Sequence, residues 1–281
     1  MTLSKQKTCS NTIAFAFLCL LSAIFLVPIL LVLLNSFKSR FYISSSPFAM
    51  PNSETFVGFE NYLNGLSSSG FFISFIRSVW VSIASVLVII VCTSMASWFI
   101  VRVKNKFTKA IYFLFAFSMI VPFQMVMYTM TFIVNRISFD NIFGIVFVYL
   151  GFGAGLSVFM FTGFVKAVPL EIEEAAEIDG CNPLQTFFLV VFPVLKPTII
   201  TVSILNSMWV WNDYLLPYLI LGTDHKTVPV AIQIAMQGAY GATDYGGFMA
   251  MLVLAIIPIL IFYIASQKYI IKGVISGAVK G

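Results

Sequence analysis

From Val168 to Pro197 the chain reads VPLEIEEAAEIDGCNPLQTFFLVVFPVLKP, and this segment separates two long apolar runs. Five acids fall within nine residues of its first half: Glu171, Glu173, Glu174, Glu177 and Asp179. The cytoplasmic leaflet of a membrane is anionic, so an acidic segment is repelled from the lipid surface. We therefore do not expect this segment to lie on lipid. Its residues alone are equally consistent with a surface that binds another protein and with a solvated connector that caps the helices.

The first half of the segment predicts a short helix with a face suited to docking. Ile172, Ala175 and Ala176 are spaced i, i+3 and i+4, which gives one small apolar face between acidic flanks. Glutamates are favourable near the positive N-terminal end of a helix. Gly180 suits the left-handed turn that ends a helix.

The second half of the segment predicts another helix after a sharp turn. Asn182 and Pro183 match an N-cap residue followed by a first-turn proline. Pro193 and Pro197 are expected to break this helix where the chain enters the membrane. The sequence thus predicts a helix–turn–helix over 168–197.

Six apolar stretches elsewhere are long enough to cross a membrane, which takes about 20 residues for about 30 Å of hydrocarbon. They are Thr12–Leu34, Ser78–Val101, Ala110–Val134, Asn141–Val165, Pro197–Thr223 and Phe248–Ser266. Of the 281 residues, 60% are hydrophobic and only 10% are charged, whereas soluble domains carry about 25% charged residues. The sequence predicts an all-α, polytopic membrane protein with six transmembrane helices, and the whole of 1–281 as a single transmembrane domain.

The loops orient these helices, because cytoplasmic loops carry an excess of Lys and Arg. With the N-terminus inside, the inner side holds most of the 16 basic residues. These are Lys5, Lys7, Arg102, Lys104, Lys106, Lys109, Lys166, Lys196, Lys268, Lys272 and Lys280. The predicted topology therefore places both ends in the cytoplasm. It leaves Phe37–Phe71 outside as irregular structure, and it leaves Val228–Met236 outside as a short helix.

Several functions are excluded by motifs that the sequence lacks. It has no G-x-x-x-x-G-K-[ST] stretch to hold ATP phosphates, and no H-E-x-x-H or G-x-S-x-G motif of a protease or lipase. The four cysteines have no metal-ligand spacing, and the basic residues form no patch for nucleic acid. We predict no catalytic residue, no metal site, no cofactor and no nucleic-acid partner.

The acidic segment resembles the EAA loop of importer-type ABC transporter permeases. The residues that carry the resemblance are Glu174, Ala175, Ala176, Asp179, Gly180, Pro193 and Pro197. In that family the loop forms a coupling helix that docks in a cleft of the cytoplasmic ATP-binding subunit. The resemblance implies that coupling here depends on Glu171, Glu174, Ala175, Ala176, Asp179 and Gly180.

Further motifs resemble the carbohydrate-importer branch of these permeases, and within it the second, MalG-like subunit. They are GFENY at 58–62, WNDY at 211–214 followed by Pro217, TVPV at 227–230, and the tail QKYIIKGVISGAVKG from Gln267. The resemblance implies a type I ABC importer permease fold, with a core over 72–267 and the coupling loop at 168–197. It also implies a multi-pass protein of the bacterial inner (cytoplasmic) membrane, embedded in the lipid bilayer.

The resemblance further implies the partners of an importer for a sugar such as an oligosaccharide. These are a second, homologous permease subunit forming a heterodimer, two ATP-binding subunits on the cytoplasmic side, and an extracellular solute-binding protein. The chain itself is then a transport subunit and not an enzyme.

Polar and aromatic side chains within the predicted spans are candidates for the translocation pathway. They are Gln124, Asn206, Trp209, Asn212, Asp213 and Tyr214. Asp213 reads equally as an interfacial carboxylate in an aromatic belt or as a hydrogen-bond partner for sugar hydroxyls. Gln124 lies beside Pro122 in the middle of the third predicted span, where a polar amide and a kink suggest a pathway or gate. A polar contact between helices is the alternative. Gly151 and Gly155 form a small-x-x-x-small pair that predicts close helix packing.

Rival functions remain open on the sequence alone. An ion-coupled secondary carrier would need ionisable intramembrane groups and inverted repeats, and the sequence offers only Asp213 and no repeat. A membrane-embedded enzyme would need a nucleophile–base pair or a metal constellation. Within the ABC class, a permease for a non-sugar solute is the remaining alternative.

Overall fold

The computed structural model describes residues 2–237 and 244–278, and the regular elements of this part are all helices. Contacts divide the chain into two compact units. One consists of Met1–Phe71 and Ala231–Ile257, and the other of Phe72–Val230 and Pro258–Gly281. The all-helical prediction is confirmed.

The first unit begins with a long apolar helix, α1 (Thr2–Asn35), whose segment Thr12–Asn35 qualifies as a membrane span. Two short helices follow it, α2 (Arg40–Ser45) and α3 (Glu60–Ser69). The predicted irregular segment is therefore more ordered than expected.

Side chains from one motif organise this segment. Asn61 Nδ2 donates hydrogen bonds of 2.8 Å to the carbonyl oxygens of Ser36 and Lys38. The hydroxyls of Tyr62 and Ser36 lie 2.7 Å apart. These bonds join residues far apart in sequence and are largely buried, so they fix α3 to the chain that leaves α1. The composition of the segment alone could not predict this connection.

Two helices of the second unit are unbroken spans, as predicted. They are α4 (Phe71–Arg102) and α7 (Gly144–Val165), both long and apolar enough to cross a membrane. Together with α1 and α14 (Tyr245–Ala278), they make four spans in the described residues. The count rises to six if two sharply bent helix pairs each form one span.

The third predicted span, Ala110–Val134, is not one continuous helix. The structure has α5 (Lys106–Ser118) and α6 (Phe123–Arg136), with a bend of 108° between them. Pro122 immediately precedes α6 with an extended backbone (φ −64°, ψ 138°). Proline lacks the N–H that a continuous helix needs, and it disfavours helical geometry in the residue before it, which explains the break.

The fifth predicted span, Pro197–Thr223, is also divided. It consists of α11 (Lys196–Asn212) and α12 (Leu215–Leu221), with Asp213 extended between them (φ −75°, ψ 122°). Further along the chain, α13 (Val228–Gln237) confirms the short helix predicted at Val228–Met236.

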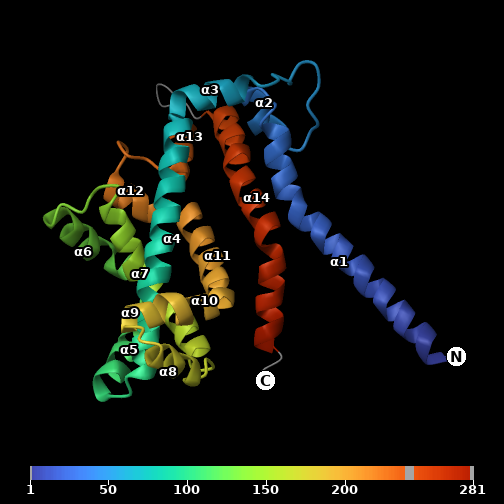
Figure 1. Cartoon of the computed structure of the whole chain (residues 1–281). Helices are drawn as coiled ribbons and strands as arrows, with labels where there is room; N and C mark the ends of the chain where they lie inside the picture. The colour runs from blue at the N-terminus through green and yellow to red at the C-terminus, as the bar shows by residue number, and fades with distance from the viewer. Residues whose placement is uncertain (1, 238–243, 279–281) are drawn as a thin grey trace. The chain divides into compact units, whose positions relative to one another are not determined.

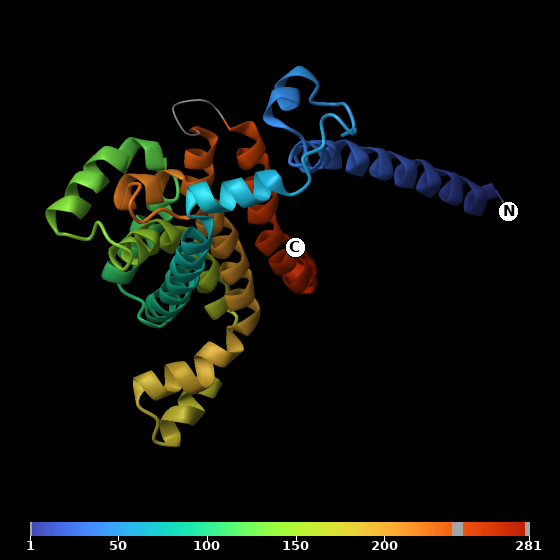
Figure 2. The ribbon, with the colours of Figure 1, turned by 90° about the horizontal axis from the view of Figure 1, so that it is seen from above.

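The predicted helix–turn–helix over 168–197 is confirmed. It comprises α8 (Glu171–Ile178), α9 (Pro183–Gln185), the π-helix η1 (Thr186–Val191) and α10 (Phe192–Val194). The chain then bends by 78° into α11. Figure 1 shows α5, α8 and α9 gathered near the end of α4, and Figure 2 shows the hairpin of α8 and α9 standing out to one side of α11.

A buried apolar cluster connects this hairpin to the membrane helices of the same unit. Its members come from α4, α7, η1, α11 and the turns between them: Val86, Ile89, Ile90, Phe161, Val165, Val168, Phe187, Val191, Leu195 and Val202. Because the hairpin contributes to the same core as the spans, its position is fixed by packing.

Candidate functional site

Helix α8 exposes most of its acids. Glu171, Glu174 and Glu177 are exposed, as are Asp179 and Gly180 beyond the helix end. Ile178 is the most exposed large apolar residue of the hairpin, with 86% of its surface accessible. The accessible surface of α8 therefore combines several acidic side chains with one exposed large apolar side chain, that of Ile178.

The exposed apolar face differs from the predicted one. Ala175 is exposed, but Ala176 is buried (6% exposed) and Ile172 packs against the buried cluster. The predicted face of Ile172, Ala175 and Ala176 is therefore divided between the interior and the surface. Glu173 is buried on the same side of the helix as Ala176, and Ala175 and Ile178 lie on the exposed side.

The end of α8 is set by Gly180, as predicted. Its φ is +87°, in the left-handed region that favours glycine. Cys181 N donates to Ala176 O at 3.0 Å and Gly180 N donates to Glu177 O at 3.0 Å. These two bonds form a Schellman motif, which fixes the direction of the chain after α8.

The second helix of the hairpin starts as the sequence predicts. Asn182 Oδ1 accepts a hydrogen bond of 2.9 Å from Gln185 N, and Asn182 N donates to Gln185 Oε1 at 2.9 Å. This reciprocal pair is a capping box, with Pro183 in the first turn. The bend into α11 falls at Leu195, between Pro193 and Pro197.

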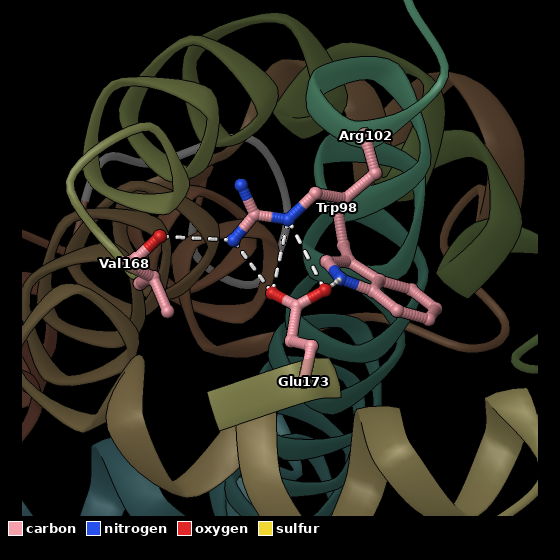
Figure 3. Close-up of polar contacts among 4 residues, drawn as sticks. All are labelled: Trp98, Arg102, Val168 and Glu173. Carbon is pink, nitrogen blue, oxygen red and sulfur yellow. Dashed lines mark hydrogen bonds and ion pairs between the residues drawn. The ribbon is translucent and has the colours of Figure 1, made fainter. Parts of the chain in front are cut away.

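Glu173 is the acid that the sequence did not single out. It is only 4% exposed, and its carboxylate faces the last turn of α4 (Figure 3). Arg102 Nη2 donates to Glu173 Oε1 at 2.6 Å, and Arg102 Nε donates to Oε1 and Oε2 at 3.0 and 3.1 Å. Trp98 Nε1 donates to Oε2 at 2.9 Å. A buried carboxylate with this set of donors is a charge-assisted network.

Arg102 also bonds to the turn that precedes α8. Its Nη2 donates to Val168 O at 3.0 Å (Figure 3). One guanidinium therefore binds both the entry to the hairpin and its first helix. A signal for this network was present in the sequence, since Trp98 and Arg102 are four residues apart and so share one face at the inner end of a predicted span.

A cavity of about 760 Å³ lies beside this network. Basic residues from the predicted cytoplasmic loops and acids of α8 line it, among them Lys104, Lys109, Lys166, Glu174 and Glu177. In the described residues, no group of three His, Cys, Asp or Glu side chains could hold a metal ion.

Asp213 is bound at the junction of α11 and α12. Its Oδ1 accepts from Leu215 N at 3.0 Å and from Leu216 N at 3.4 Å. Tyr149 Oη donates to Oδ2 at 3.1 Å. The carboxylate therefore caps the start of α12 and joins it to α7, a structural task that neither sequence interpretation included.

Asn206 lies between two helices. It is 4% exposed, and its Nδ2 donates to Ser157 Oγ at 3.2 Å and to Val202 O at 2.9 Å. Within this chain it is a polar contact between α11 and α7, as is common between membrane helices.

The other pathway candidates have more accessible side chains. Trp209 is 39% exposed and packs edge-on against Tyr149, Asn212 is exposed, and Tyr214 stacks on Tyr218. Gln124 is exposed in the first turn of α6, beyond the break. The structure thus brings Trp209, Asn212, Asp213 and Tyr214 to one junction, with Gln124 on a separate helix.

Close helix packing is confirmed at Gly155 but not at Gly151. A Cβ at Gly155 would lie 2.6 Å from Ser118 Oγ and 2.9 Å from Phe115 O of α5, whereas a Cβ at Gly151 would meet nothing within 4 Å. Another close approach of α7 is at Gly153, against Ile89 and Asn206.

A multi-pass helical membrane protein with a projecting acidic hairpin has the architecture of a transporter permease. A family model described as the inner membrane component of binding-protein-dependent transport systems matches residues 89–276. The chain belongs to this family.

Relatives and a solved structure agree with this assignment. The chain is 34% identical over 92% of its length to the probable starch degradation products transport system permease protein AmyC of Thermoanaerobacterium thermosulfurigenes, covering 93% of that protein. It is 35% identical over 91% of its length to the multiple sugar-binding transport system permease protein MsmG of Streptococcus mutans, covering 92% of that protein.

The solved structure is a crystal structure of a bacterial ABC transporter involved in the import of the acidic polysaccharide alginate. One of its chains matches with a TM-score of 0.78 at 19% identity, covering 94% of this chain and 97% of that one. The likeness shows that this protein has the type I ABC importer permease fold.

Proposed function

We propose that this chain is one permease subunit of a binding-protein-dependent ABC importer, that it forms part of the membrane pathway for a sugar, and that separate subunits hydrolyse the ATP. The whole chain is then a single permease domain, with its core at 72–267. The observation that carries the proposal is the projecting helix α8, which presents Glu171, Glu174, Ala175 and Ile178 on its exposed side.

The sugar substrate is supported by the relatives. The two named above are described as permeases for starch degradation products and for multiple sugars. A third, 31% identical over 91% of this chain, is described as a melibiose/raffinose/stachyose import permease of Bacillus subtilis. We infer an oligosaccharide or a related carbohydrate.

The partners follow from this role. Two ATP-binding subunits bind on the cytoplasmic side, one of them at α8, and a second, homologous permease subunit completes the pathway as a heterodimer. A solute-binding protein outside the cell delivers the sugar. The chain then lies in the bacterial inner membrane with both ends in the cytoplasm.

The coupling surface consists of Glu171, Glu174, Ala175, Asp179 and Gly180, together with Ile178. Ala176 supports it from below, because its side chain is buried. For the pathway, we propose that Trp209, Asn212 and Tyr214 meet the sugar, since aromatic faces and amides suit its rings and hydroxyls. Asp213 and Asn206 hold these helices in place, and Gln124 faces the pathway from α6.

Charge reversal on the coupling surface tests the proposal. Glu174→Lys with Asp179→Lys should abolish uptake of radiolabelled sugar and reduce the amount of ATP-binding subunit that co-purifies. The matched control is Glu54→Lys with Asp140→Lys, two exposed acids on the predicted outer side. Unchanged uptake and unchanged co-purification in the first variant would refute the proposal.

A further inference from the structure

The last turn of α4 contacts both helices of the coupling hairpin. Through Trp98 and Arg102 it hydrogen-bonds Glu173 of α8. The ring of Trp98 also packs against Phe187 of η1, with ring centroids 5.5 Å apart. Trp98 is therefore shared between the two helices, and α4 is attached to each of them.

These contacts are directional, and their acceptor, the Glu173 carboxylate, is largely shielded from water. The Glu173 side chain has 6% of its surface accessible and that of Arg102 has 21%. An apolar contact tolerates sliding, whereas a carboxylate bound by a guanidinium fork and an indole N–H loses bonds when either partner shifts by about an ångström. Such a network transmits displacement between the elements that it joins.

Glu173 is chemically separate from the docking acids. Glu171 and Glu174 are exposed on the side of α8 that carries Ile178, whereas Glu173 is buried and its carboxylate is directed toward α4 (Figure 3). The helix therefore has one acidic side available to a partner and one acid fixed to the membrane core. A force applied to the exposed side reaches α4 through Glu173.

We propose that Arg102, Glu173 and Trp98 form the mechanical connection through which movement of α8 reaches the membrane, and that α4 is the first span to move. The proposal rests on the proposed function, because it requires an ATP-binding subunit to displace α8. Arg102 and Glu173 are positioning residues: they touch neither sugar nor nucleotide.

The test uses the complete transporter in proteoliposomes, and it measures sugar molecules imported per ATP hydrolysed. Glu173→Gln and Arg102→Gln should each lower this ratio about fivefold or more. Fivefold is the factor that corresponds to the weakest typical coupling between two sites. The loss in the double variant should be smaller than the two single losses combined, because both substitutions remove the Arg102–Glu173 bonds. The amount of co-purified ATP-binding subunit should remain normal, since the docking face is unchanged. Arg136→Gln, an exposed arginine at the end of α6, is the control.

The outcomes separate this inference from the proposed function. If the unmodified complex lacks an ATP-binding subunit or does not import sugar, the proposed function fails. If the unmodified complex is active and both variants keep its ratio, the function stands and the inference is overturned.

A second measurement applies even if these variants fail to fold. Spin labels are placed at Glu177→Cys and Lys104→Cys, with Cys9, Cys19, Cys92 and Cys181 replaced by serine, and distances are compared with and without bound ATP. The distance from α8 to the end of α4 should stay constant, while the distance from Glu177→Cys to a label at Asp140→Cys should change. A change in the first distance, or no change in either, would overturn the proposal.

Discussion

The hydroxyl of Tyr149 in α7 donates a hydrogen bond of 3.1 Å to the carboxylate of Asp213, at the junction of α11 and α12. The same carboxylate accepts backbone N–H groups of Leu215 and Leu216. The fifth span therefore divides at Asp213, and this residue is hydrogen-bonded to α7. The division is thus part of the fold.

Removing the hydroxyl should weaken this junction without unfolding it. Tyr149→Phe should lower stability by about 0.6 kcal/mol and at most about 1.7 kcal/mol, the average and the maximum for side-chain hydrogen bonds between membrane helices. The two backbone donors still hold Asp213, so the loss should be partial. Thermal unfolding of the purified complex measures it, with the exposed Tyr218→Phe as control. Equal midpoints for Tyr149→Phe and Tyr218→Phe would contradict the role given to the bond.

The packing of α5 against α7 depends on the absence of a side chain at Gly155. Gly155→Ala places a Cβ within 3 Å of atoms of Phe115, Ser118 and Met119, so it should cost about 1–3 kcal/mol by overpacking. Gly151→Ala adds a methyl group in open space within the chain and should be neutral or slightly stabilising. A loss of stability that is equal in the two variants would show that the contact at Gly155 is unimportant.

Gly180 should be required for the direction of the chain after α8. Alanine in the left-handed region costs about 1–2 kcal/mol, and Gly180→Ala should reduce retention of the ATP-binding subunit because Asp179 is displaced. Gly180→Asn should retain more of the ATP-binding subunit than Gly180→Ala, since asparagine tolerates the left-handed backbone region. Gly163→Ala, within α7 and with no atom near the added Cβ, is the control. Full retention in Gly180→Ala would contradict this requirement.

The local stability of the segment after α1 should depend on pH because of Lys38. It is 1% exposed, its Nζ donates to Ser46 O at 3.0 Å, and burial lowers its pKa below 10.5. The unfolded segment then binds more protons than the folded one between the lowered pKa and 10.5, so local stability should rise with pH across that window. Limited proteolysis should slow as the pH rises toward 10.5, and Lys38→Met should remove the trend. A trend of the opposite sign would contradict the account.

Long apolar runs were sufficient to predict the spans within α1, α4, α7 and α14, because about 20 apolar residues cross the hydrocarbon. Three of these helices, α1, α4 and α14, extend beyond the predicted spans. Local capping signals were sufficient for the hairpin, because Gly180 and Asn182 act on their own neighbours. The division of the fifth span at Asp213 was not predicted, and beside Pro122 the sequence predicted a kink rather than a bend of 108°. Both lie within runs that composition alone reads as continuous.

The inward direction of Glu173 was also not predicted. Nothing local separates it from four neighbouring acids, and its partners are about 70 residues earlier in the chain. Asp213 is similar, since Tyr149 is 64 residues away. Side chains whose roles depend on such distant partners need the folded chain to assign them.

The most direct test of the account concerns the side of the membrane that α8 faces and what covers it. Ile178→Cys, in a chain without other cysteines, is treated with a membrane-impermeant maleimide. The account predicts no labelling in intact cells, strong labelling in inside-out vesicles stripped of ATP-binding subunits, and protection when those subunits are restored. Labelling from outside intact cells, or labelling that the subunits do not reduce, would contradict it.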